Sequence, residues 1–425
     1  SINYAERSDL FEGLSIWKNE KYRDLQGTYP VISLSFANIK ERDYQTTRKK
    51  ICQIIVELYT NYSFLLDSQK LKDGDRDFFQ RISINMDDVD ATMAIHYLCK
   101  YLYMYYGKKV IVLLDEYDTP MQEAYVNGYW DELVSFTRSL FNSTFKTNPY
   151  LERGLMTGIT RVSKESIFSD LNNLEVVTTT SDKYATSFGF TEEEVRGLCA
   201  KYDMDFDTVK TWYNGYLIDG MHMYNPNSVA MAMDRHRYDS YWKNTSSFAS
   251  INTFITMNYA GLKDDIMTML SGGKVYVNTE NFQNDLSIIS SKDDAITALI
   301  HLGYLGYDME DLSAYIPNYE VKKAYQSALN TGSWSEVAKS VSKCDELLKA
   351  TINGNADKVA EIIEIAHETY TSVLTYNDEN SLSCVLTMAY FTAPAYYNVI
   401  REMPAGKGFA DFVFIPRSNA GSRPA

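Results

Sequence analysis

Three short apolar runs in the first 160 residues have the character of β-strands. They are YPVISLSFANI (29–39), VIVLL (110–114) and LERGLMTGIT (151–160), all rich in aliphatic side chains. The five residues at 110–114 are apolar without alternation, which is typical of a strand buried on both faces of a parallel sheet. We therefore expect a parallel sheet in this part of the chain.

Amphipathic segments separate these runs. Residues 44–66, 87–106 and 120–146 space their apolar side chains as helices do, and Gly107 suits the C-cap of the second helix. The resulting order of strand, helix, strand, helix and strand predicts a doubly wound α/β fold.

The pattern changes after residue 200. Short helices and tyrosine-rich turns predict a mainly helical region over 201–330. Amphipathic helices are then predicted at 336–351 and 355–370, with a third from Asn380, before a strand pair spanning 397–416. This last region is therefore α/β again.

A chain of 425 residues is too long for one ordinary core, since domains usually hold roughly 100–200 residues. The changes in pattern predict three domains, at 1–200, 201–330 and 331–425.

Acidic residues follow the strand at 110–114, which continues as Asp115-Glu116-Tyr117-Asp118. Ligands of open α/β sheets bind at the carboxyl ends of the strands. Hydrolysis of a phosphoanhydride needs a divalent metal and an oriented water. Asp115 would hold the Mg²⁺ shell through water and Glu116 would orient the attacking water, while Tyr117 and Asp118 would line the site. The alternative is an ordinary buried strand that ends in solvated acids.

The next predicted strand favours the nucleotide hypothesis. Its apolar run is broken by Thr157, at the strand tip where a group that senses the γ-phosphate would lie, and Arg161 follows as a second candidate for nucleotide binding. The alternative for this segment is a surface turn. No Gly-x-x-x-x-Gly-Lys-Ser/Thr sequence occurs in the chain, so the loop that cradles phosphates is absent from it. We expect that loop on a strand upstream of Ser1.

Several longer motifs resemble bacterial AAA-ATPase-like proteins, in the same order along the chain. The motifs are VIVLLDEYDTP, TGITRVSKESIFSDLNNL, SFGFTEEEV, WYNGY, YNPNSV, HLGYL and IPNYEVKKAY. The resemblance implies a P-loop NTPase-type parallel sheet core, with ATP and Mg²⁺ as cofactors. It covers nearly the whole chain.

The same family carries a C-terminal PD-(D/E)XK nuclease-like domain, which has an α/β restriction-endonuclease-like fold. DENSLSCVLTMAY and IREMPAGKGFADFVFIP look like its opening half. By this resemblance Glu379 is the acid on a helix and Asp411 the metal-binding aspartate, and both would serve as metal ligands. The E-x-K that should follow is expected just beyond Ala425.

Residue chemistry alone leaves two hypotheses for Asp411. Metal-dependent nucleases use several carboxylates around Mg²⁺, and an acid among apolar neighbours is costly unless it is paired. Strand alternation places Phe409 and Val413 on the same face as Asp411, which favours the hypothesis that Asp411 binds a metal. The alternative is an outward-facing residue on an amphipathic strand. Asp378, Glu379 and Asn380 also fit an ordinary helix N-terminus.

The composition indicates which binding partners and which location to expect. The chain has 41 basic and 56 acidic residues, a net charge of −15, which argues against non-specific coating of nucleic acid. DNA or RNA binding through a local groove in the C-terminal region stays open, as does oligomerisation. The longest branched-aliphatic run is far short of a membrane span, and five scattered cysteines suit reduced thiols, so a cytoplasmic location is expected.

The sequence therefore predicts an ATP-binding protein and ATPase coupled to a nuclease-like domain. The rival hypothesis is a non-hydrolysing interaction or scaffold protein in which nucleotide is a structural ligand and the nuclease-like domain is inactive.

Overall fold

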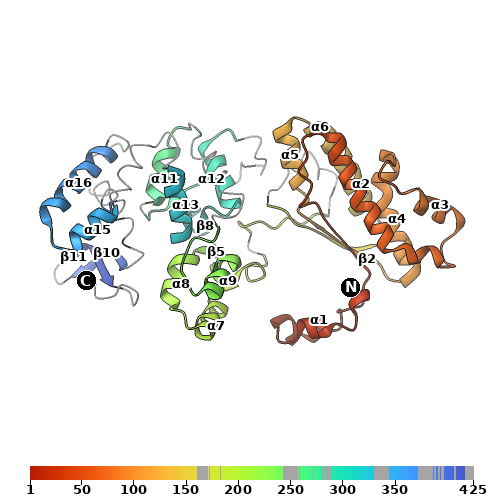
Figure 1. The fold of residues 1–425 in the computed structure, drawn as a ribbon, viewed down its shortest axis with the longest axis horizontal. Helices are drawn as coiled ribbons and strands as arrows, with labels where there is room; N and C mark the ends of the chain where they lie inside the picture. The colour runs from red at the N-terminus through yellow and green to blue at the C-terminus, as the bar shows by residue number, and fades with distance from the viewer. Residues whose placement is uncertain are drawn as a thin grey trace. The chain divides into compact units, whose positions relative to one another are not determined.

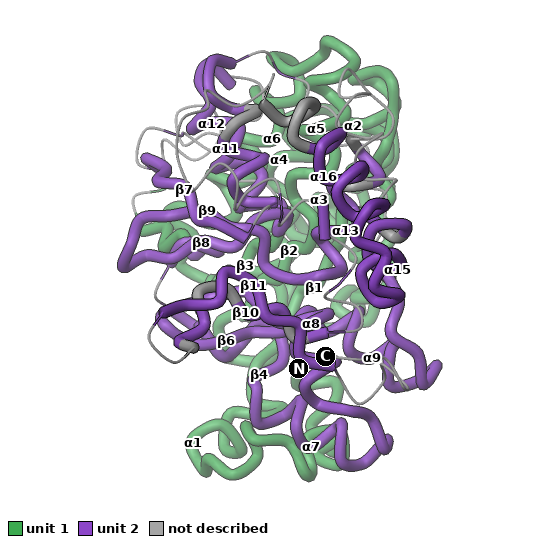
Figure 2. Tube along the Cα trace, turned by 90° about the vertical axis from the view of Figure 1, so that its left-hand side faces the viewer, with its two compact units in different colours: residues 1–176, 283–288 green, residues 177–282, 289–425 purple. Residues whose placement is uncertain are grey.

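The computed structural model divides the chain into two compact units (Figure 2). Unit 1 comprises residues 1–176 and 283–288, and unit 2 comprises residues 177–282 and 289–425. The structure describes residues 1–159, 171, 173–181, 183–242, 257, 259–270, 272–279, 282, 289–329, 344–371, 386, 389–390, 393, 397–405 and 408–416.

Unit 1 contains a three-stranded parallel sheet, which lies along one side of its helices (Figure 1). Its strands are β1 (Val31–Ser35), β2 (Val110–Asp115) and β3 (Leu151–Met156), in the order β1-β2-β3. The sheet confirms the predicted parallel α/β core and is consistent with a P-loop-like arrangement. All three strands end at the same edge, which is where the acidic residues follow β2.

Helices connect the strands, and three of them form a layer on the sheet. α2, α4 and α6 contact one another, and each also contacts one strand, β1, β2 and β3 respectively. The helices of unit 1 are α1 (Glu20–Arg23), α2 (Tyr44–Asn61), α3 (Asp73–Arg81), α4 (Asp88–Tyr106), α5 (Thr119–Asn127) and α6 (Trp130–Phe145), with 3-10 turns at Ile2–Tyr4, Ser8–Phe11, Ser15–Lys18 and Ser63–Asp67.

Glycines end two of these helices in the left-handed conformation. Gly107 caps α4 with φ +68°, as predicted, and its N–H donates to the carbonyl of Tyr103. Gly128, at φ +80°, ends α5, so the single helix predicted over 120–146 is in fact two. A left-handed residue cannot continue an α-helix, and glycine adopts it without steric cost.

The sheet is packed more tightly on one face than on the other. Ile32, Leu34, Val112 and Leu114 are at most 5% exposed, whereas the side chains of β1 and β2 on the opposite face are partly buried or exposed. In β2 this gives alternation of buried and partly buried positions. The prediction of a strand buried on both faces was wrong, because the described helices that contact the sheet pack against one side of it.

β3 lies at the edge of this sheet and is largely open to solvent. Its four central residues are exposed, and Leu155 is 57% exposed. Phe145 of α6 packs on β3 so closely that a Cβ at Gly154 would lie 2.6 Å from its ring. Among the described residues β3 pairs with β2 alone.

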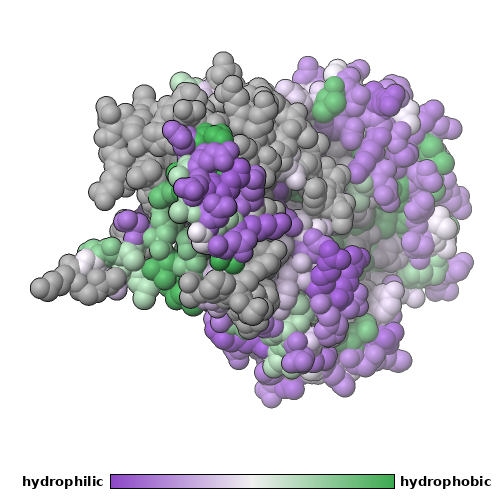
Figure 3. Space-filling view, turned by 60° about the vertical axis from the view of Figure 1, so that its left-hand side comes forward, coloured by the Kyte–Doolittle hydropathy of each residue, from purple (hydrophilic) through white to green (hydrophobic). Residues whose placement is uncertain are grey.

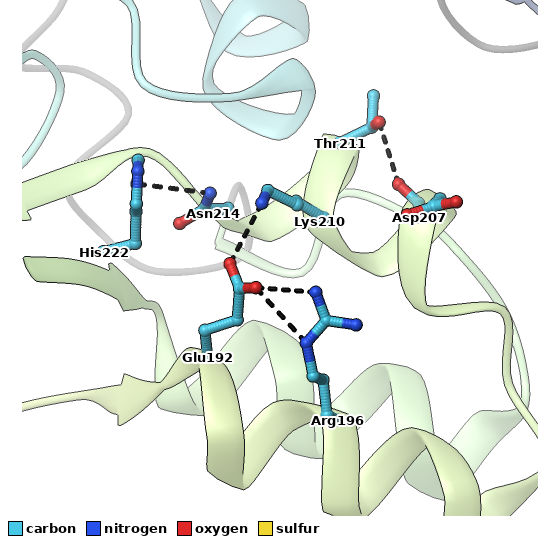
Figure 4. A network of polar contacts seen from close by, with 7 residues as sticks. All are labelled: Glu192, Arg196, Asp207, Lys210, Thr211, Asn214 and His222. Carbon is cyan, nitrogen blue, oxygen red and sulfur yellow. Dashed lines mark hydrogen bonds and ion pairs between the residues drawn. The ribbon is translucent and has the colours of Figure 1, made fainter.

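Unit 2 begins with a small antiparallel sheet, ordered β4-β6-β5, and three helices that share a core. Its elements are β4 (Phe190–Thr191), α7 (Glu192–Tyr202), α8 (Phe206–Tyr213), β5 (Tyr216–Ile218), β6 (Met221–Tyr224) and α9 (Pro226–Arg235). Figure 4 shows how Glu192 of α7 accepts from Arg196 and, at 3.0 Å, from Lys210 of α8. The hydrogen bonds from Arg196 and Lys210 lower the pKa of Glu192.

A second antiparallel sheet, ordered β7-β9-β8, follows with three helices. Its elements are α11 (Leu262–Leu270), β7 (Val275–Tyr276), α12 (Lys292–His301), β8 (Gly306–Asp308), β9 (Ser313–Tyr315) and α13 (Tyr319–Leu329). The WYNGY motif packs against IPNYE here: the rings of Trp212 and Tyr319 meet edge to face, with centroids 4.7 Å apart. Gly215, at φ +111°, lies against the backbone of Pro317.

The last described elements are α15 (Cys344–Ile352), α16 (Ala356–Thr371) and the antiparallel pair β10 (Tyr397–Ala405) and β11 (Gly408–Pro416). α16 and the strand pair match the elements expected there, and α15 matches the second half of the helix expected over 336–351. Residues 336–343 and the helix expected from Asn380 lie outside the described residues. Phe409 is 71% exposed on β11. Figure 3 brings the C-terminal elements forward and shows apolar residues gathered in one patch beside a mainly hydrophilic surface.

Candidate functional site at the carboxyl edge of the parallel sheet

Asp115 lies between two hydroxyl groups at the carboxyl edge of the sheet. It is the last residue of β2 and pairs in register with Ser35, the last residue of β1. Ser35 Oγ donates to Asp115 Oδ2 at 3.3 Å, and Thr157 Oγ1, just beyond β3, donates to Asp115 Oδ1 at 2.6 Å. Hydroxyl groups at the ends of β1 and β3, the two neighbours of β2, therefore bond to both carboxylate oxygens of the exposed Asp115.

Glu116 adopts an unusual backbone conformation beside Asp115. Its φ is +54°, a left-handed value that costs a side-chain-bearing residue free energy. Thr119 Oγ1, at the start of α5, donates to Glu116 Oε2 at 3.1 Å. The next amide, of Tyr117, donates to the carbonyl of Thr157 at 3.1 Å. The turn after β2 is thus tied both to β3 and to α5.

Asp118 is buried, with no exposed surface. Gln122 Nε2 donates to its Oδ2 at 2.9 Å, one turn further along α5. A Cβ at position 158 would lie 2.3 Å from Asp118 Oδ1, so Gly158 is needed for this close approach. The geometry gives Asp118 a packing contact between α5 and the segment after β3, and its expected contact with nucleotide stays a prediction.

Two of the predicted site residues, Arg161 and Glu379, lie outside the described residues. Asp411 is described and lies on β11 with its side chain exposed. Residues 409 and 415 share its face by strand alternation, and both are exposed apolar side chains. Its role as a metal ligand stays a prediction.

The donor atoms around Asp115 suit a hard cation. Mg²⁺ is usually held by one or two carboxylates, with water and phosphate oxygens completing its shell. Asp115 offers such a carboxylate, and the neighbouring Ser35 and Thr157 offer hydroxyl oxygens. Within the described part of the chain, no three acidic, histidine or cysteine side chains come together as a metal site. A cation here would therefore depend on the oxygens of a bound phosphate.

The sequence predicted that Asp115, Glu116 and Thr157 lie at one edge of the sheet. It did not predict the contacts of Ser35, Thr119 and Gly158. Ser35 lies within the run predicted as a strand over 29–39, but that prediction did not show that the strand ends at Ser35, beside Asp115. Thr119 and Gly158 give no signal in the sequence, since their roles depend on the left-handed turn at Glu116 and on the burial of Asp118.

The described helices include none that is both long enough and apolar enough to cross a lipid bilayer. The four described cysteines, Cys52, Cys99, Cys199 and Cys344, are buried free thiols.

Comparison with known proteins gives two matches. An uncharacterised protein from the vnfD 5' region of Azotobacter chroococcum mcd 1 is 25% identical over 247 residues, which is 57% of this chain and 43% of that protein. The chain thus spans less than half the length of this relative. No solved structure matches the chain. Residues 1–168, which include Asp115, Glu116 and Thr157, match the family model described as a predicted AAA-ATPase.

Proposed function

We propose that unit 1 carries the hydrolytic side of an ATP site and that the full-length protein is an ATPase. One observation supports this most directly: Asp115 is fixed by Ser35 and Thr157 at the carboxyl edge of a parallel sheet. The match of residues 1–168 to predicted AAA-ATPases supports the same reading.

In this proposal each residue has a separate task. Asp115 would hold the hydrated Mg²⁺, which when bound would neutralise charge on the phosphate oxygens. Glu116 would orient the attacking water, with Thr119 limiting the positions its carboxylate adopts. Thr157 would couple the γ-phosphate to Asp115, because its hydroxyl already bonds to that carboxylate. Arg161 would neutralise phosphate charge.

The 425 residues contain no Gly-x-x-x-x-Gly-Lys-Ser/Thr sequence, so the proposal requires another segment to bind the phosphates. Among the described residues β3 pairs only with β2 and is exposed, so its outer edge could accept a further strand. We therefore place the expected loop in the full-length protein.

Phosphate release from ATP by the full-length protein tests the proposal. Glu116→Gln keeps the size of the side chain but removes its charge and should abolish turnover while leaving ATP binding intact. Glu57→Gln makes the same chemical change on an exposed position of α2 and serves as the control. Equal turnover by both variants would refute the role of Glu116.

A non-hydrolysing protein that uses nucleotide as a structural ligand is the rival. It predicts ATP binding with no turnover, so neither substitution would change phosphate release. The left-handed Glu116 is compatible with both hypotheses, because strained residues concentrate at functional sites of any kind, so ATP turnover decides between them.

The second part of the proposal concerns the C-terminal region, where ATP would control a nuclease-like output through Asp411 and Glu379. It rests on the motif resemblance over residues 378–416. Cleavage of DNA or RNA by the full-length protein should then depend on ATP and fall with Asp411→Asn. Equal cleavage with and without ATP would refute the coupling.

A further inference from the structure

A surface pocket lies where α5 ends and α6 begins, away from Asp115. Its volume is about 510 Å³, and six residues line it: Tyr125, Gly128, Tyr129, Trp130, Asp131 and Glu132. Tyr125, the first of these residues in the chain, lies six residues beyond Thr119 at the start of α5, which is roughly 9 Å along the helix at 1.5 Å per residue. The pocket is therefore separate from the acidic strand tip, and binding there would be independent of the ATPase proposal.

Aromatic rings form the walls of this pocket. The rings of Tyr125 and Trp130 meet edge to face, with centroids 6.2 Å apart and planes at 88°. Tyr125 is 50% exposed, so part of its ring is accessible. Tyr129 is buried below, and its hydroxyl donates to the carbonyl of Glu41 at 2.7 Å. The walls are therefore anchored in the core of unit 1 yet accessible from solvent.

Two carboxylates give the pocket its charge. Asp131 and Glu132 are exposed in the first turn of α6, and neither has an ion-pair partner in the described part of the chain. Other acids lie close by: burial, together with the charges of Glu123, Asp43 and Glu41, raises the pKa of Tyr129. The first turn of a helix accommodates two acids without a ligand. The helix N-terminus does not account for the accessible aromatic rings beside these acids.

Aromatic faces and carboxylates together match one chemical group. A guanidinium is planar, stacks on aromatic rings and donates two parallel hydrogen bonds to a carboxylate, whereas an ammonium is a compact, strongly hydrated point charge. We propose that this aromatic and acidic pocket binds an arginine side chain presented by a basic segment of a partner protein.

Size and charge indicate what carries the arginine. A pocket of about 510 Å³ has room for more than one side chain, so it suits an arginine together with its neighbours in a peptide. The chain itself has a net charge of −15, which makes a second copy an unfavourable occupant.

Calorimetric titration of the chain with blocked peptides tests this inference. The probe is Gly-Gly-Arg-Gly-Gly, and the matched control replaces arginine by citrulline, which has nearly the same shape but no charge. The arginine peptide should bind saturably and more weakly as salt rises, because the partners are exposed charges. The citrulline peptide should bind at least about tenfold more weakly, which corresponds to about 1.4 kcal/mol.

Substitutions locate the binding. Asp131→Asn with Glu132→Gln should weaken binding about tenfold, and Tyr125→Ala should also weaken it. The control is Asp73→Asn with Asp77→Asn on α3, which removes the same charge from exposed helical positions of unit 1. Circular dichroism should show that all variants keep their helix content.

Four results would overturn the proposal. The first three are equal binding of the arginine and citrulline peptides, equal binding by the pocket variant and the α3 control, and no saturable binding of the arginine peptide. A fourth is self-association of the chain, measured by sedimentation, that is lost in the pocket variant. That result would make a second copy the occupant instead of a basic partner.

Discussion

Thr157 Oγ1 donates a hydrogen bond of 2.6 Å to Asp115 Oδ1, joining two residues that lie 42 positions apart in sequence. The contact exists because β2 and β3 are adjacent parallel strands, so their carboxyl ends meet. Thr157→Val keeps the shape of the side chain and removes the donor. We expect ATP turnover by the full-length protein to fall about tenfold, equivalent to about 1.4 kcal/mol. Thr157→Ser keeps the hydroxyl and should retain most activity, and equal rates for the two variants would contradict this.

Gly158→Ala should destabilise unit 1. The added Cβ would lie 2.3 Å from Asp118 Oδ1, and that carboxylate is buried and bonded to Gln122, so it cannot move cheaply. Overpacking of this kind costs about 1–3 kcal/mol, measurable by urea unfolding. Gly74→Ala in α3 is the control, because nothing lies within 4 Å of its Cβ, and it should be neutral or stabilising.

Glu116→Gly should make the protein more stable while removing activity. Glycine adopts the φ of +54° without the cost paid by other residues, which is about 1 kcal/mol. Glu116→Ala loses the same carboxylate but keeps the strained backbone. Urea unfolding should therefore show the glycine variant to be more stable than the alanine variant. Equal stability would show that the left-handed turn costs little.

Gly215→Ala should be among the most damaging substitutions in unit 2. Its Cβ would lie 1.8 Å from the carbonyl oxygen of Pro317, and its φ of +111° disfavours any side chain. We expect a loss of stability above about 3 kcal/mol. Gly220→Ala shares the positive φ but meets nothing within 4 Å, so it should cost only about 1–2 kcal/mol. Thermal or urea unfolding of both variants separates crowding from backbone strain.

Glu320 gives unit 2 a dependence on pH. It is 1% exposed, and its Oε1 accepts the backbone N–H groups of Tyr241 and Trp242 at 2.5 and 2.7 Å. Burial raises the pKa of this carboxyl despite those hydrogen bonds. The folded state therefore holds the proton more tightly than the unfolded state. The contribution of Glu320 to the free energy of unfolding is fully present below the ordinary glutamate pKa, about 4.3. It is lost as the pH rises through the raised pKa of the folded state.

Glu320→Gln keeps the acceptor oxygen and removes the titration. Relative to this variant, the unsubstituted protein should lose stability between about pH 4 and the raised pKa of Glu320. Glu310→Gln, on an exposed turn, is the control. Unfolding curves measured across that range test the sign, and parallel curves for the two proteins would contradict it.

The sequence predicted the parts of unit 1 that depend on local pattern. Five aliphatic residues followed by Asp-Glu placed β2 and its acids, and the next apolar run placed Thr157 beside them. These follow from strand periodicity and from the rule that parallel strands end at one edge. The helix break at Gly128 was missed, because a single glycine within an amphipathic pattern is compatible with a continuous helix.

Details of the site that depend on packing could not be predicted. Asp118 was expected to line a nucleotide site, and in the structure it is buried against Gly158. The sequence does not predict this contact, because the two residues are far apart in the chain. The half-open face of β2 was also missed, since five consecutive apolar residues do not reveal which helices cover them. The three-domain division and the roles of Arg161, Glu379 and Asp411 stay predictions.

The exposed edge of β3 has a practical consequence for handling the protein. Within the described part of the chain β3 has no strand on its outer side, and Leu155 is exposed, so extended segments of other molecules can add to it. Concentrated samples of this chain should accordingly tend to aggregate by strand addition. Leu155→Lys introduces the charge that natural edge strands use against such growth, and it is the first substitution to try when preparing material for crystallisation.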